Sequence, residues 1–200
     1  IMKRVILLWY YNIWFYPYVH VIYHNIIFYK ETNFLLLSGT PGVGKSTICK
    51  ILSERMKYTW REVSKLAEEF NCLDEYDPEY HCPVLNDDKM LDIMESMMEK
   101  GGNIVDYHGS EFFPERWFDG VFVIRTNNTI LYDRLVARGY SGKKLEDNIQ
   151  CEIFEVLLEE AQNSYKPEIV KELQNDTQEQ LLANVENIIE WIEKWKEDNL

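Results

Sequence analysis

Cysteine is scarce in this 200-residue chain. The four cysteines, Cys49, Cys72, Cys82 and Cys151, lie 23, 10 and 69 residues apart, and these spacings match no zinc-binding or redox motif. They are also too few and too scattered for the disulfide framework of a small secreted domain. We therefore expect reduced thiols in a nuclear or cytosolic protein, packed as ordinary small side chains.

Positive charge is also in short supply. Lysine and arginine together number 21 against 34 acidic residues, which gives a formal net charge of −13. Proteins that bind duplex DNA through its phosphates need an excess of cationic side chains, so direct DNA binding is not expected. The sequence also contains no internal repeat and no low-complexity linker, and its length suits one domain better than two.

Charge is absent from the 25-residue stretch between Val5 and Tyr29. Residues 1–33 hold ten of the 28 aromatic residues, and their net charge of +2 leaves −15 for residues 34–200. The stretch is long enough to cross a bilayer, but a proline and several polar residues interrupt it, and no signal-peptide cleavage site follows. We favour a non-native or poorly ordered leader, with a membrane anchor and a docked hydrophobic arm as alternatives, and a membrane role is not expected.

From Phe34 onward, short apolar runs alternate with helical stretches. The runs at 34–38, 103–106 and 120–125 are typical of strands buried on both faces of a parallel sheet. A last strand is expected near Ile169. Helices are predicted over about 45–57, within 61–100 on both sides of a turn-rich segment at 74–83, over about 129–138, from about 142 to 164, and after the capping box at 177–180. Residues 34–200 are therefore expected to form one α/β domain, a parallel sheet flanked by helices, with ligands at the carboxyl ends of the strands.

The first apolar run is followed by Gly39-Thr-Pro-Gly-Val-Gly-Lys-Ser46, which fits the pattern G-x-x-x-x-G-K-[ST]. Its place between a strand and a helix matters, because backbone N–H groups and the positive end of the helix must point at an anion. In this pattern Lys45 reaches the β- and γ-phosphates of a nucleotide, and the Ser46 hydroxyl binds Mg²⁺. The sequence thus predicts ATP and Mg²⁺ as ligands, with a glycine-rich turn that binds nothing as the alternative.

Two polar residues close the second apolar run. Asp106 stands at its carboxyl end, where a carboxylate can act through water on the Mg²⁺ held by Ser46. His108 follows two residues later, and in extended chain this offset points both side chains to the same side. His108 is therefore a candidate for orienting a water or a substrate oxygen, and a hydrogen-bonded structural histidine is an equal alternative.

Phosphoryl transfer needs cations around the migrating group, so the positions of the seven arginines are informative. Arg116 follows the polar strand end, and Arg138 directly precedes the turn at 139–142, which is a candidate hinge for a short lid. We expect both to take part in catalysis. Arg61 and Arg125 are interpreted as surface salt-bridge residues.

Together these residues resemble the adenylate kinase isoenzyme 6 family, the coilin-interacting nuclear ATPases. The resemblance covers about residues 34–195, and the motifs that carry it are Gly39–Ser46, Val105–Gly109, Phe112–Trp117, Arg138–Tyr140 and Asp147–Glu152. It implies the P-loop nucleoside monophosphate kinase fold with two activities, ATP:AMP phosphotransfer and ATP hydrolysis. It also implies a role in maturation of the small ribosomal subunit, contact with a small-subunit ribosomal protein, and localisation to nucleus and cytoplasm.

The resemblance also implies roles for individual positions. ATP phosphates would be bound by Gly42, Gly44, Lys45, Ser46 and Thr47, with Arg138 of the lid also touching ATP. Asp106 and His108 match the pair that family members need for turnover. The monophosphate-binding region would span about 62–85, and the lid about 137–147. One departure stands out: Glu68 occupies a position where related kinases often have arginine, and Lys65 is the candidate substitute.

Two functions stay open from the sequence. The first is a kinase that phosphorylates AMP or a related monophosphate, and the second is an assembly ATPase whose AMP turnover is incidental. The acidic body of the chain would suit a basic ribosomal protein in the second case. Phosphorylation of a small molecule that is not a nucleotide fits the phosphate loop but not the downstream motifs.

Overall fold

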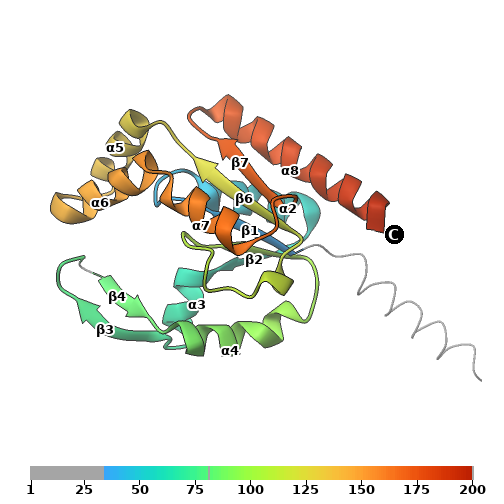
Figure 1. The fold of residues 1–200 in the computed structure, drawn as a ribbon, viewed down its shortest axis with the longest axis horizontal. Helices are drawn as coiled ribbons and strands as arrows, with labels where there is room; N and C mark the ends of the chain where they lie inside the picture. Colours follow the sequence, from blue (N-terminus) through green and yellow to red (C-terminus); the bar gives the residue numbers. More distant parts are fainter. Residues whose placement is uncertain (1–33, 81, 200) are drawn as a thin grey trace, which may run out of the picture.

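The computed structural model describes residues 34–80 and 82–199 (Figure 1). The leader predicted at residues 1–33 lies outside the described residues. Within the part of the chain that the structure describes, no helix combines the length and the apolar character needed to span a bilayer.

A five-stranded parallel sheet forms the centre of the molecule (Figure 1). Its strand order is β2-β5-β1-β6-β7. The bounds are Phe34–Ser38 for β1, Thr59–Glu62 for β2, Asn103–Asp106 for β5, Gly120–Arg125 for β6 and Val170–Gln174 for β7. The three apolar runs become the three central strands, which confirms their prediction. The polar edge strand β2 was not predicted, because its residues lack the apolar run by which the central strands were identified.

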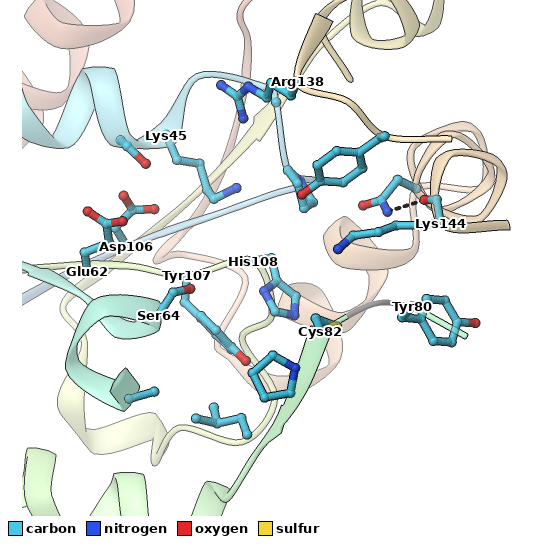
Figure 2. Close-up of a pocket in the computed structure, with 18 of the residues that line it drawn as sticks. Lys45, Glu62, Ser64, Tyr80, Cys82, Asp106, Tyr107, His108, Arg138 and Lys144 are labelled. Atoms are coloured by element: carbon cyan, nitrogen blue, oxygen red, sulfur yellow. Dashed lines mark hydrogen bonds between the residues drawn. The ribbon is translucent and has the colours of Figure 1, made fainter. Parts of the chain in front are cut away.

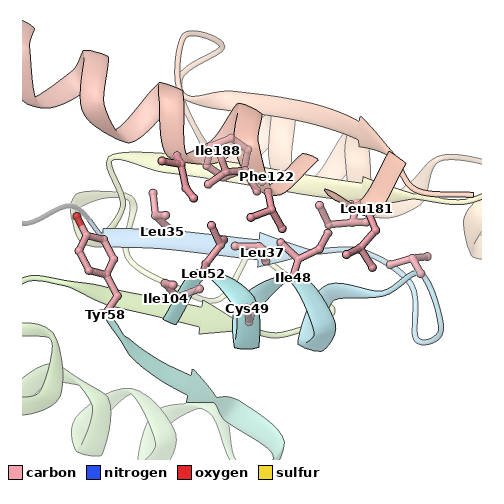
Figure 3. Close-up of a cluster of buried hydrophobic side chains, with 14 of the residues drawn as sticks. Leu35, Leu37, Ile48, Cys49, Leu52, Tyr58, Ile104, Phe122, Leu181 and Ile188 are labelled. Atoms are coloured by element: carbon pink, nitrogen blue, oxygen red, sulfur yellow. The ribbon is translucent and has the colours of Figure 1, made fainter. Parts of the chain in front are cut away.

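Helices cover both faces of the sheet, and β1 shows how its residues divide between them. Leu35 and Leu37 point into a cluster with α2 (Lys45–Met56), α5 (Asn128–Ala137) and α8 (Gln178–Asn199) (Figure 3). Leu36 points into the cluster on the opposite face, with α3 (Val63–Glu69), α4 (Asp87–Met98) and α7 (Val156–Ser164). Burial of each such leucine contributes about 1.5–3 kcal/mol, so the two layers fix the sheet and with it the strand ends.

The predicted capping box is present at the start of α8. The Gln180 amide donates to Thr177 Oγ1 at 3.2 Å, and the Thr177 amide donates to Gln180 Oε1 at 3.3 Å. These reciprocal bonds satisfy two N–H groups that the first turn leaves without helical partners.

Two local predictions were wrong. The segment at 74–83 is not only turn, because Leu73–Asp77 (β3) and Cys82–Leu85 (β4) pair as an antiparallel hairpin between α3 and α4. Backbone pairing forms this hairpin, whose side chains are exposed or half-buried and so show no core pattern. The helix predicted from 142 to 164 is also interrupted: α6 (Gly142–Ile153) ends before α7, and Glu155 between them has a left-handed φ of 56°.

Candidate functional site

A cleft of about 760 Å³ opens at the carboxyl ends of β1, β5 and β2. One wall is the phosphate loop and the start of α2, and the other is α3 with the β3–β4 hairpin. Residues of α6 and of the turn before it close the far end (Figure 2). The cleft therefore brings together the phosphate loop, the polar strand end and the two regions predicted as monophosphate site and lid.

The phosphate loop depends on glycine at positions where the backbone is left-handed. Gly44 has a φ of 109°, and a Cβ atom built there would lie 2.4 Å from Asn175 Nδ2. Asn175 in turn donates from Nδ2 to the carbonyl of Val43 at 2.6 Å, which fixes the loop against the end of β7. The helix α2 begins immediately afterwards with no side-chain cap, so its first N–H groups are available to an anion.

Lys45 lies buried within the loop. Its ammonium donates to the carbonyls of Gly39 and Thr40 at 2.5 and 3.1 Å. Burial lowers the pKa of Lys45 to about 8, the Asp106 carboxylate opposes this shift, and the Arg138 guanidinium adds to it. A buried ammonium held by two loop carbonyls is placed to move onto a phosphate when a nucleotide arrives.

Two carboxylates lie side by side at the ends of neighbouring strands. Asp106 of β5 and Glu62 of β2 are register partners in the parallel sheet, and both face the cleft (Figure 2). Burial raises the pKa of Asp106, while the nearby Ser46 hydroxyl and a hydrogen bond of 3.3 Å from Trp60 Nε1 favour its charged form. Glu62 also pairs with Lys65 at 2.5 Å.

The Ser46 and Asp106 pair fits the predicted Mg²⁺ site. The Ser46 side chain is exposed and lies close enough to the Asp106 carboxylate to favour its charged form, so both oxygen donors reach one place in the cleft. In residues 34–80 and 82–199 no group of three or more His, Cys, Asp or Glu side chains could hold a metal ion alone. A Mg²⁺ ion here would therefore complete its shell with water and phosphate oxygens, which is the usual arrangement beside a phosphate loop.

His108 lies in the cleft as predicted from its two-residue offset from Asp106. Its carbonyl accepts from the Gly39 amide at 3.2 Å and from Ser38 Oγ at 2.6 Å, which ties the end of β5 to the start of the loop. Its imidazole is open to the cleft. Burial between the walls of the cleft is the main cause that lowers its pKa to about 4, and the Lys45 ammonium is the second cause. The ring is therefore neutral near pH 7 and can donate one hydrogen bond and accept another.

The structure brings one of the two predicted catalytic arginines to the site. Arg138 follows α5 and lines the cleft near Lys45 (Figure 2). Arg116 lies outside the cleft lining, in a short 3-10 turn over Glu115–Trp117 (η2), where it bonds both carboxylate oxygens of Glu95 on α4 at 2.8 and 2.7 Å. The prediction that Arg116 acts at the site is thus not supported by its position, because the turn directs it toward α4.

Arg125, interpreted from the sequence as a surface residue, belongs to a buried ion pair instead. Its side chain is 12% exposed and donates from Nε to Glu152 Oε1 at 2.6 Å. Glu152 is also the acceptor for Thr40 Oγ1 of the phosphate loop at 2.6 Å and for the Thr126 amide at 3.2 Å. This carboxylate joins the loop, the end of β6 and the last turn of α6.

Glu152 and Glu62 take part in the site, but the sequence did not predict either of them as a site residue. Glu152 was noticed only as part of a motif, and a glutamate in a helical stretch gives no sign of burial. Glu62 could have been found only if β2 had been predicted, because the register of β2 with β5 puts Glu62 beside Asp106.

The lid and hairpin regions contact each other across the mouth of the cleft. Tyr80 donates from its hydroxyl to Asp147 Oδ2 at 2.7 Å, and Lys143 pairs with Glu79 at 2.7 Å. The segments predicted at 62–85 and 137–147 thus form opposite sides of one cleft.

Comparison with known proteins identifies the family. Residues 35–155 match the family model described as AAA domain. An adenylate kinase isoenzyme 6 homolog from Drosophila melanogaster is 49% identical over 162 residues, covering 81% of this chain and 93% of the relative. The homolog from Saccharomyces cerevisiae is 40% identical, covering 82% of this chain and 84% of the relative.

Solved structures show the same fold at low sequence identity. Shikimate kinase from Acinetobacter baumannii in complex with shikimate superposes with a TM-score of 0.57 at 14% identity, covering 83% of this chain and 96% of that one. A gluconokinase from Sinorhizobium meliloti superposes with a TM-score of 0.52 at 15% identity, covering 83% and 98%. These matches establish the kinase fold, with its parallel sheet flanked by helices. With its phosphate loop, its strand-end carboxylate and its curated relatives, the chain belongs to the adenylate kinase isoenzyme 6 family and has a P-loop function of the nucleoside monophosphate kinase type.

Proposed function

We propose that this protein transfers the γ-phosphoryl group of ATP to AMP or a related nucleoside monophosphate. The observation that carries the proposal is the continuity of the cleft, which runs from the phosphate loop to α3 and the hairpin without a barrier. Its volume of about 760 Å³ lies within the range of ligand sites. The donor phosphates occupy the loop, and the acceptor lies against the second wall.

The transfer breaks the bond between the γ-phosphorus and the bridging oxygen of ATP and forms a bond to a phosphate oxygen of the acceptor. ADP leaves, and the acceptor becomes a diphosphate. The acceptor oxygen is already ionised near pH 7, because the second pKa of a phosphate monoester is about 6. No side chain needs to remove a proton, so the work of the protein is positioning and neutralising charge.

The residues of the cleft supply that work. Lys45 and Arg138 place positive charge along the donor phosphates, and the N–H groups at the start of α2 add hydrogen bonds. Ser46 and Asp106 would hold Mg²⁺, which when bound neutralises charge shared between the β- and γ-phosphates. His108, being neutral, can orient an oxygen by a hydrogen bond without adding charge.

The test measures ADP produced from ATP with and without AMP, and then replaces Lys45 with alanine. We expect AMP to stimulate ADP production and Lys45→Ala to abolish it, with the circular dichroism spectrum unchanged. Lys50→Ala is the matched control, because Lys50 lies on the same helix, is exposed and does not line the cleft. Absence of stimulation by AMP and by every other nucleoside monophosphate, or an unaffected Lys45→Ala rate, would overturn the proposal.

We further propose that the protein hydrolyses ATP and acts in maturation of the small ribosomal subunit, in nucleus and cytoplasm, through contact with a small-subunit ribosomal protein. The family resemblance and the charge of −15 over residues 34–200 support this second function, because an acidic surface attracts a basic partner. Co-purification with such a protein that is lost at high salt is the expected result. Retention at high salt would contradict an electrostatic contact.

A further inference from the structure

The two basic residues expected on the acceptor side of the cleft, Lys65 and Arg116, do not present free cations there. Glu68 of α3 lines this side of the cleft with a carboxylate, and Lys65, the candidate phosphate ligand of α3, is 70% exposed in its side chain and pairs with Glu62. Arg116 pairs with Glu95 outside the cleft. The second wall instead presents carboxylates, including Glu68 and Asp77. A monophosphate ester placed against this wall would meet repulsion unless a cation comes from elsewhere.

Across residues 34–80 and 82–199, the lysines and arginines that line the cleft are Lys45, Arg138 and Lys144. Lys45 is held in the phosphate loop, and Arg138 lies close enough to it to lower its pKa, so both belong to the donor end. Lys144 comes from the first turns of α6, on the far side of the cleft. Figure 2 shows its side chain extending from α6 into the cleft on the side of His108 and Cys82.

Lys144 is available for an anion. It is half-buried, its ammonium lies 4.9 Å from the ring centroid of Tyr140, and no carboxylate of the described chain pairs with it within 4.0 Å. Asn148, one helical turn later, donates to the Lys144 carbonyl at 2.6 Å and also lines the cleft. The neighbouring Lys143 is used differently, because it pairs with Glu79 on the hairpin.

We propose that Lys144 binds the phosphate of the acceptor monophosphate and supplies the positive charge that α3 lacks. This inference rests on the proposed kinase function and names the residue that recognises its second substrate. A charge-assisted hydrogen bond to a phosphate in a partly enclosed site is worth roughly a 10- to 100-fold change in affinity. The lid thus contributes both the cation on the donor side and the cation on the acceptor side.

The test compares Lys144→Met and Lys144→Arg with Lys143→Met. The Lys143→Met variant removes the same charge at the neighbouring position, whose side chain faces the hairpin. For Lys144→Met we expect KM for AMP to rise roughly 10- to 100-fold, while KM for ATP changes less than about threefold. Lys144→Arg should recover most of the loss, and Lys143→Met should leave both KM values within about threefold of the unchanged protein. Thermal melting checks that each variant is folded.

Direct binding separates phosphate recognition from recognition of the nucleoside. Calorimetric titration should show weaker AMP binding to Lys144→Met, with adenosine binding unchanged. A normal KM for AMP in Lys144→Met, or an equal loss for AMP and adenosine, would overturn the role of Lys144. A rise in KM for ATP alone would overturn it in favour of a donor contact. Failure of the unchanged protein to bind or phosphorylate any monophosphate would instead overturn the proposed function.

Discussion

Removing the buried carboxylate of Glu152 should destabilise the fold and loosen the phosphate loop together. The residue is 2% exposed and accepts hydrogen bonds from Thr40, Arg125 and Thr126, at 2.6, 2.6 and 3.2 Å. Glu152→Ala leaves the hydroxyl, the guanidinium and the amide without this acceptor. Breaking a buried ion pair by removing one partner typically costs about 3–5 kcal/mol, because the remaining charge is left uncompensated.

The surroundings of Arg125 place the expected loss at the lower end of that range. Two other carboxylates, Glu155 and Glu172, lie 3.3 Å from its Nη1 atom and keep part of its charge compensated. We therefore expect Glu152→Ala to lower the free energy of unfolding by about 3 kcal/mol. At about 2–4 °C per kcal/mol for a chain of this size, Tm should fall by roughly 6–12 °C.

Urea unfolding followed by circular dichroism measures this loss, and two variants calibrate it. Glu152→Gln keeps an acceptor for Arg125 and Thr126, and the Thr40 hydroxyl can rotate to accept from the new amide, so about half the loss is expected. Glu172→Ala is the control, because that carboxylate touches the same guanidinium but is 49% exposed, and exposed pairs are worth about 0–1 kcal/mol. If Glu152→Ala lay within about 0.5 kcal/mol of the unchanged protein, the view that this carboxylate joins loop, strand and lid helix would be refuted.

Three further outcomes are expected. Gly44→Ala should abolish ATP binding and lower Tm, because the backbone φ of Gly44 is 109° and the new Cβ would lie 2.4 Å from Asn175. Gly139→Ala is the control: the φ of Gly139 is 83°, but its new Cβ would have no atom within 4 Å, so only the backbone strain should lower Tm. Burial lowers the pKa of Lys45 to about 8, so kcat/KM for ATP should fall as the pH rises through that value and the ammonium loses its proton; a profile flat to the ordinary lysine value of 10.5 would contradict this. Tyr80→Phe removes the hydrogen bond from hairpin to lid, so amide hydrogen exchange in β3 and β4 should speed up several-fold, and an unchanged exchange rate would show that this bond does not restrain the hairpin.

The parts of this fold that the sequence predicts are those whose signal is local. Buried strands in a parallel sheet read as apolar runs, so β1, β5 and β6 were found within their observed bounds. The phosphate loop was found because its glycines, lysine and serine occupy consecutive positions. The hairpin β3–β4 and the edge strand β2 were missed, since both are only partly buried and are held by backbone pairing that leaves no regular apolar pattern.

Residues of the site that belong to local motifs were likewise easier to predict than residues that only the fold brings there. Lys45, Ser46, Asp106, His108 and Arg138 all line the cleft. The hydrogen bond between Thr40 and Glu152, by contrast, joins residues 112 positions apart, and no local pattern in either segment predicts this contact. Arg116 was misplaced for the same reason, because its partner on α4 is fixed by packing and not by its own motif.

The strand order explains why the proposed phosphoryl transfer needs cations from outside the sheet. Because β5 lies between β1 and β2, the parallel register sets Glu62 directly beside Asp106, and the Glu62 carboxylate adds to the burial that raises the pKa of Asp106. These two carboxylates repel phosphates, and the second wall of the cleft adds more carboxylates. The sheet and α3 therefore cannot by themselves neutralise the two phosphate-bearing substrates of the proposed reaction. The described residues that line the cleft offer three cations for the proposed transfer, Lys45 of the loop and Arg138 and Lys144. The last two lie on either side of the Gly139–Gly142 turn, so in this proposal neutralisation of the transferring group depends on where that segment lies.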